Sequence, residues 1–95
     1  MDPTQKTKYS NELCRYMAHV YRQRREELGL TKEEVAALIN KPVSIVTKSE
    51  NSFRIGINEV FMLGEDVYGL DMIALLEEAE EHIQTVLCDR VQTTE

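Results

Sequence analysis

The chain has 95 residues, and 11 Lys and Arg side chains against 17 Asp and Glu give it a formal net charge of −6. This length predicts one small domain, and 42% apolar with 29% charged residues argues against disorder. No stretch approaches the roughly 20 apolar residues of a membrane span, and the N-terminal residues lack the apolar run of a secretory signal, so we expect a cytoplasmic protein without membrane association. The negative charge also argues against binding to DNA phosphates.

The first predicted helix runs from Ser10 to Leu28. Ser10 can cap its first turn, and Gly29 can end it in the left-handed conformation. We expect residues 1–9 to form a flexible N-terminus. The apolar residues of this helix recur with the α-helical period: Leu13, Met17, Val20, Tyr21 and Leu28.

Two short helices with a tight turn between them are predicted next. Thr31 and Glu34 have the spacing of a capping box at the start of one helix. Asn40 suits a left-handed helix end, and Pro42 suits the first position of the following helix, over residues 43–50. The apolar face of the earlier helix consists of Val35, Leu38 and Ile39.

Two further helices complete the predicted fold. Asn58 can cap a fourth helix over residues 59–68, which Gly69 ends, and Asp71 can cap a fifth over residues 72–90. No segment shows the two-residue alternation of a strand, so the sequence predicts an all-α protein of five helices. The fourth helix is expected to point four side chains inward: Val60, Phe61, Val67 and Tyr68.

The net charge is distributed unevenly along the chain. Residues 1–50 carry nine basic and seven acidic side chains, a net +2, whereas residues 51–95 carry two and ten, a net −8. Both halves could simply be solvated helix faces. Because the negative charge is concentrated in the second half, the net charge of −6 does not exclude DNA binding by the first half.

The two short helices have the arrangement of a helix-turn-helix. The segment from Arg25 to Ile39, which contains Gly-Leu-Thr-Lys-Glu-Glu-Val-Ala, together with Glu50, resembles the lambda-repressor/Cro-like family, also called the xenobiotic-response-element family. The resemblance covers about residues 13–76. It implies a five-helix DNA-binding domain over residues 10–76, with the helix 43–50 in the major groove.

Five residues depart from the family pattern. Lys32 replaces a Gln and can still reach a phosphate, Asn40 and Ser52 each replace a Gly, and Pro42 replaces a Ser or Thr helix cap. Ser49 stands where the family commonly has Ile or Leu, which predicts a softer core beneath the third helix.

The resemblance also implies roles for individual residues. Arg25 and Glu50 would form a buried ion pair that fixes the recognition helix. Base contacts would come from Val43, Ser44, Thr47 and Lys48. Phosphate contacts would come from Lys32, Lys41, Asn51 and Arg54. The alternative is that these side chains are merely solvated.

The predicted fifth helix continues past the predicted domain into a C-terminal extension, residues 77–95, which is the candidate dimerisation segment. With Met72 to Leu76 in the core, an exposed apolar surface would remain for dimerisation, formed by Ile83, Val86 and Leu87. The alternative is that this segment folds back on the first helix. Its acidic residues would face water or a partner: Glu77, Glu78, Glu80 and Glu81.

No catalytic or metal-binding pattern is evident. Cys14 and Cys88 stand alone, His19 and His82 are isolated, and no phosphate loop or nucleophile motif occurs, so we expect neither an enzyme nor a cofactor.

The sequence therefore predicts a sequence-specific transcriptional repressor that binds a double-stranded DNA operator as a homodimer. Two alternatives remain open. One is an antitoxin that also represses its own operon and holds a toxin on its acidic C-terminal half. The other is a helical protein-interaction module that does not bind DNA.

Overall fold

The computed structural model describes residues 3–93, with side chains from Lys6 to Val86. Every regular element in that range is a helix, which confirms the all-α prediction. The molecule is elongated, with extents of 49 × 22 × 19 Å. In chain order the elements are α1 (Pro3–Glu27), α2 (Lys32–Ile39), α3 (Val43–Asn51), α4 (Ile57–Phe61), the π-helical segment η1 (Met62–Val67) and α5 (Met72–Thr93).

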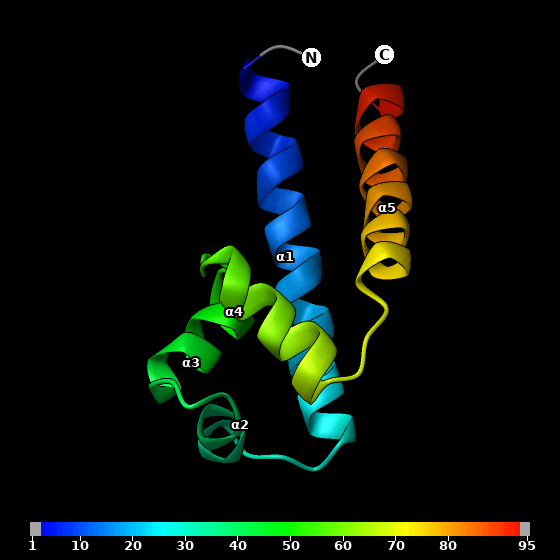
Figure 1. The fold of residues 1–95 in the computed structure, drawn as a ribbon. Helices are drawn as coiled ribbons and strands as arrows, with labels where there is room; N and C mark the ends of the chain where they lie inside the picture. The colour runs from blue at the N-terminus through cyan, green and yellow to red at the C-terminus, as the bar shows by residue number, and fades with distance from the viewer. Residues whose placement is uncertain (1–2, 94–95) are drawn as a thin grey trace.

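The long helix α1 organises the fold. The shorter helices gather around its C-terminal half, and α5 returns antiparallel along its N-terminal half (Figure 1). The rings of Tyr16 and His82 lie 5.0 Å apart where α1 and α5 pack together. None of the helices in the described chain is both long and apolar enough to cross a membrane.

Tyr21 is the centre of the core at the C-terminal half of α1. Its ring meets Phe53 and Tyr68 edge-on, at centroid distances of 4.9 and 5.3 Å. Its hydroxyl donates a hydrogen bond to the Val60 carbonyl at 2.7 Å, so the buried polar group is satisfied. Around it are buried Met17, Val35, Ile39, Val46, Leu63, Met72, Leu75 and Ala79.

The helix ends predicted around α2 are present. The Thr31 hydroxyl and the Glu34 carboxylate each accept the other residue's backbone N–H at 3.1 Å, which completes the capping box. Gly29 and Asn40 have positive φ values of 70° and 54°, as left-handed helix ends require. Asp71 accepts the backbone N–H of Ala74 at 3.2 Å and so caps α5.

Two predicted helix starts are wrong. α1 begins at Pro3, not after Ser10, so the backbone of residues 3–9 is helical. Pro suits a first turn, because its missing N–H has no helical partner there, and the return of α5 gives the longer helix a packing surface (Figure 1). α4 begins after Gly56, which places Asn58 inside the helix.

The predicted fourth helix is an α-helical turn followed by the π-helical segment η1. Gly64 is buried within η1. A Cβ at this position would collide with the Tyr21 hydroxyl and the Met72 sulfur. The absence of a side chain at Gly64 therefore lets α1, η1 and α5 approach one another closely.

Several side chains predicted to face inward lie at the surface. Leu38 is 65% exposed, because α2 is covered only on the side of Val35, Ala36 and Ile39. Leu28 and Phe61 are each 41% exposed. On α5 the buried residues are Met72, Leu75, Ala79 and Ile83, so Leu76 is turned outward and is 45% exposed.

The prediction that Ile83 lies on an exposed dimerisation face is wrong. Ile83 is fully buried within the single chain, and Val86 is half-buried. α5 folds back on α1, the alternative considered from the sequence, because the longer α1 offers half-buried apolar side chains such as Leu13 and Tyr16 for it to cover. The side chain of Leu87 lies outside the described residues.

Candidate nucleic-acid interface

The turn between α2 and α3 sets the direction of α3. The backbone N–H groups of Asn40 and Lys41 donate to the carbonyls of Ala37 and Ala36, at 3.2 and 3.1 Å, and close the end of α2. Pro42 is extended, with φ −62° and ψ 150°, and its carbonyl accepts the Ile45 N–H at 3.1 Å. Pro42 is thus the residue before the helix, and α3 begins at Val43.

A forked ion pair holds α3 to α1. Arg25 donates from Nε to Glu50 Oε2 at 2.7 Å and from Nη2 to Oε1 at 3.0 Å. The Glu50 side chain is 2% exposed and that of Arg25 is 13% exposed. The hydrogen bond to Glu50 raises the pKa of the Arg25 guanidinium, which remains charged. The pair implied by the family resemblance is therefore present and screened from water.

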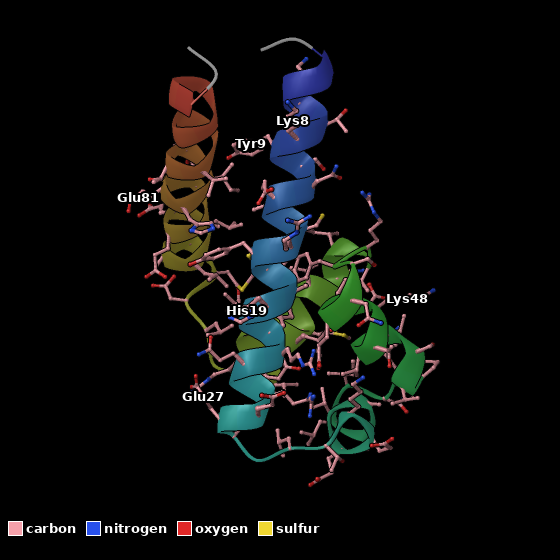
Figure 2. All side chains as sticks on the ribbon, turned by 180° about the vertical axis from the view of Figure 1, so that it is seen from behind. Lys8, Tyr9, His19, Glu27, Lys48 and Glu81 are labelled. Atoms are coloured by element: carbon pink, nitrogen blue, oxygen red, sulfur yellow. The ribbon has the colours of Figure 1, made fainter. Side chains whose placement is uncertain are left out.

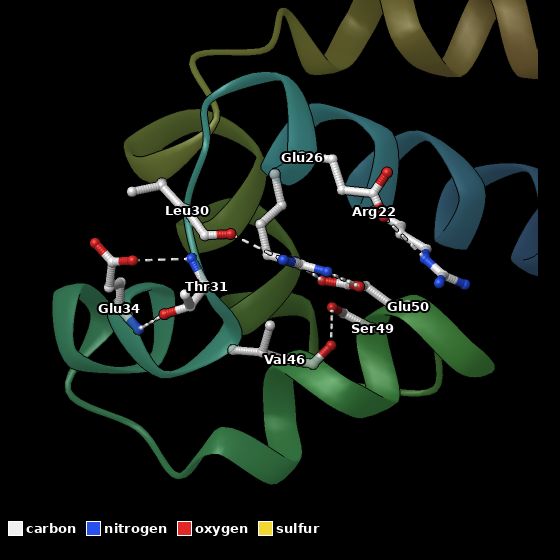
Figure 3. A network of polar contacts seen from close by, with 9 residues as sticks. Arg22, Glu26, Leu30, Thr31, Glu34, Val46, Ser49 and Glu50 are labelled. Atoms are coloured by element: carbon white, nitrogen blue, oxygen red, sulfur yellow. Dashed lines mark hydrogen bonds and ion pairs between the residues drawn. The ribbon is translucent and has the colours of Figure 1, made fainter.

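Arg25 also connects this pair to the start of α2. Its third nitrogen, Nη1, donates to the Leu30 carbonyl at 2.8 Å, directly before the capping box (Figure 3). One guanidinium thus joins α1, the loop before α2, and α3. Through these bonds, α3 is fixed relative to the rest of the fold.

Ser49 occupies the buried side of α3 without leaving a polar group unpaired. It is fully buried, and its hydroxyl donates to the Val46 carbonyl at 2.6 Å. This local bond explains how a Ser can stand where the family pattern has an aliphatic residue.

The opposite side of α3 faces outward. Val43 is 40% exposed, Ser44 and Lys48 are exposed, and Thr47 is partly exposed, whereas Val46 and Glu50 are buried. The four residues predicted to contact bases therefore share one accessible face. Figure 2 shows Lys48 pointing away from the body of the protein.

The predicted phosphate contacts lie on α2, in the turn before α3 and at the end of α3. Lys32 lies in the first turn of α2, and Lys41 in the turn before α3. Asn51 is the last residue of α3, and Arg54 follows in the loop. Within the described side chains, none of the three cations in this set forms an ion pair, so each is available to an anionic partner.

Other cations of α1 have different roles. Arg24 donates to the Tyr68 carbonyl at 2.9 Å and ties α1 to the end of η1. Arg15, His19 and Arg22 line a cleft beside the C-terminal end of α3 that the sequence analysis missed. Their spacing of four and three residues, which places them on one face of a helix, is the signal that could have indicated this cluster.

The outer face of α3 and the acidic residues of α5 are well separated at the two positions labelled on them in Figure 2. Lys48 on α3 and Glu81 on α5 point outward in opposite directions (Figure 2).

No family model, curated protein or solved structure matches the chain. Among the described residues, no group of three or more His, Cys, Asp and Glu side chains is placed to hold a metal ion. Cys14 is a free, half-buried thiol, and the side chain of Cys88 lies outside the described residues.

Proposed function

We propose that this protein is a sequence-specific DNA-binding transcriptional regulator of the lambda-repressor-like helix-turn-helix type, and that it acts as a repressor. The observation that carries the proposal is the attachment of α3. Its buried side is held by the Arg25–Glu50 fork, at 2.7 and 3.0 Å, while its outer side is accessible. A short helix rigidly mounted with polar side chains outward fits the major groove.

In this proposal the outer face of α3 reads bases. Lys48 donates to guanine O6 and N7, Ser44 and Thr47 bond base edges or phosphates, and Val43 packs on a thymine methyl group. Lys32, Lys41, Asn51 and Arg54 bind backbone phosphates and set the register of the helix on the duplex.

We propose that the second copy needed to reach two half-sites pairs through an exposed apolar face. Phe61 and Ile73 line one surface groove and are 41% and 73% exposed, and Leu76 lies one turn beyond Ile73. Solvent-exposed side chains of this kind favour a contact, and an operator with two half-sites requires a twofold partner.

Acidic residues at the rim of this groove give the dimer a characteristic salt response. Glu65 and Asp71 line the groove with Phe61 and Ile73. In a twofold dimer these carboxylates would approach their own copies, so added salt should screen the repulsion and strengthen pairing. Ile73→Glu should give a monomer in sedimentation equilibrium. Leu38→Glu, at an exposed apolar residue of α2, should leave the dimer intact.

Two substitutions test the roles within the DNA-binding face. Lys48→Ala should cost about 1–3 kcal/mol on the cognate duplex and relax specificity at one base position. Lys32→Ala should weaken binding to all duplexes alike and reduce the slope of log K against log salt by about one. Both are measured by fluorescence anisotropy, and identical behaviour of the two variants would contradict the assignment.

A second candidate is an antitoxin that represses its own operon. The acidic surface of α5, which includes exposed Glu77, Glu80 and Glu81, favours it, because this surface is free to hold a basic protein while α3 is on DNA. Co-expression with the product of the adjacent gene, followed by size-exclusion chromatography, separates the two. A stable complex supports the antitoxin, and separate elution supports the simple repressor.

A further inference from the structure

A cleft of about 420 Å³ lies between α1 and the C-terminal end of α3. α1 contributes Arg15, His19 and Arg22 to its lining, at successive turns of one helix face. Asn51, the last residue of α3, and Arg54, in the loop that follows, complete the polar wall. Side chains from segments far apart in the sequence thus converge on one hollow, which we call the arginine cleft.

The arginine cleft carries positive charge in an acidic protein. Glu50 is the lining carboxylate, but its side chain is 2% exposed and both of its oxygens are held by Arg25. Its charge is therefore already compensated. Arg54 is exposed and has no ion-pair partner among the described side chains.

The α1 arginines are only loosely paired. Arg15 is 74% exposed and lies 3.7 Å from Glu12, whose side chain is 11% exposed. Arg22 and Glu26 lie 3.3 Å apart and are 63% and 58% exposed. The Arg22 pair is exposed on both sides and contributes little free energy. The Arg15 guanidinium is itself exposed and lies beyond hydrogen-bond distance of Glu12, so both guanidinium groups are able to bind a stronger ligand. A phosphate is such a ligand, because guanidinium groups bind its oxygens in a forked geometry.

The position of the cleft indicates where that phosphate would come from. Asn51 and Arg54 line the cleft and also border the outer face of α3. If α3 lies in the major groove, as proposed above, one DNA backbone must pass its C-terminal end. The cleft opens at that end and continues past it to α1.

We propose that the arginine cleft binds a phosphate group of the DNA backbone, beyond the base-reading face, through Arg15, Arg22 and Arg54. This inference rests on the proposed function. A small phosphorylated ligand is the other source of the same chemistry. The cleft would add affinity without sequence preference, since backbone contacts carry no base information.

The test compares the full chain with Arg15→Gln/Arg22→Gln, which removes the two cleft charges that the proposed function does not already assign to phosphate binding and that are 74% and 63% exposed. Lys6→Gln, an exposed cation of α1 outside the cleft, is the matched control. Binding to a duplex from the protein's own upstream region and to a random duplex is measured by anisotropy across salt. The double variant should reduce the salt slope by about one to two on both duplexes, and the control should leave it unchanged.

A second measurement distinguishes the sources. Inorganic phosphate is titrated into the full-length protein while its backbone amide signals are followed by NMR. If the wild type binds the upstream duplex selectively and the double variant keeps its slope, the cleft proposal is overturned and the proposed function stands. If no duplex binds, the proposed function fails. Phosphate-induced shifts at Asn51 and Arg54, lost in the double variant, would then assign the cleft to a small phosphorylated ligand, and their absence would overturn the cleft as well.

Discussion

Replacement of Arg25 by Met tests whether the buried fork holds the fold together. The change removes two charge-assisted hydrogen bonds to Glu50 and one to the Leu30 carbonyl. It also leaves a carboxylate that is 2% exposed without a counter-charge. Loss of one partner from such a pair costs about 3–5 kcal/mol. A small domain has about 5–15 kcal/mol in total, so the variant should lose a large share of its stability.

Urea unfolding at neutral pH measures the loss of unfolding free energy, and thermal unfolding measures the corresponding fall in melting temperature. At the lower limit of about 3 kcal/mol, the melting temperature of a chain this size should fall by about 12–24 °C. Arg22→Met is the matched control on the same helix, because its pair with Glu26 spans 3.3 Å between side chains that are 63% and 58% exposed. The control should cost less than about 0.5 kcal/mol.

A double-mutant cycle isolates the pair itself. Arg25→Met combined with Glu50→Met removes both charges, so no unpaired carboxylate remains in the core. The double variant should therefore cost less than the sum of the two single changes, with a coupling of about 2–3 kcal/mol. A cost below about 1 kcal/mol for Arg25→Met alone, or simple additivity, would refute the reasoning.

The packing of the core leads to three further expectations, each measured by chemical or thermal unfolding. Gly64→Ala should destabilise the fold by about 1–3 kcal/mol, because its Cβ would collide with the Tyr21 hydroxyl and the Met72 sulfur. Gly56→Ala should cost much less, because its Cβ meets only the flexible end of a Glu side chain. Equal costs for the two variants would contradict the close packing at η1. Burial raises the pKa of Tyr68 to about 12, against about 10 in the unfolded chain, so the free energy of unfolding should fall as the pH rises from about 10 to 12. The fall should be less steep in Tyr68→Phe, and an equally steep fall in that variant would contradict this. Ile83→Ala should cost about 2–5 kcal/mol and Leu38→Ala, outside the proposed dimer face, close to nothing, because the two residues are 0% and 65% exposed; the reverse order would contradict the return of α5 onto α1.

The local features of the fold could be read from the sequence. The capping box at Thr31 and Glu34, and the left-handed ends at Gly29 and Asn40, depend on residues close together in the chain. Such features are specified by neighbouring side chains and backbone conformations, so tertiary packing alters them little. They were sufficient to place α2, the turn and α3.

The long-range features could not be read in the same way. The sequence marks Ile83 as apolar but does not say whether a second copy or α1 covers it. The start of α1 at Pro3 was missed for a related reason: Ser10 is a good cap in isolation, and only packing against α5 makes the longer helix useful. The fork between Arg25 and Glu50 was expected because of a family resemblance, since neither composition nor helical period could have paired them.

The arginine cleft illustrates a third limit. Arg15 and Arg22 could be assigned to one helix face from their spacing, but Arg54 joins them only because α3 ends beside α1. A charge count over residues 1–50 therefore indicated a basic half without showing where its side chains gather.

The most direct test of the central claim is a competition titration of the full-length wild type with two labelled duplexes, one from its own upstream region and one of random sequence, at several salt concentrations. We expect nanomolar binding to the upstream duplex, weakened by salt, with a preference of at least about 10³ over the random one. Weak and equal binding to both duplexes would contradict it.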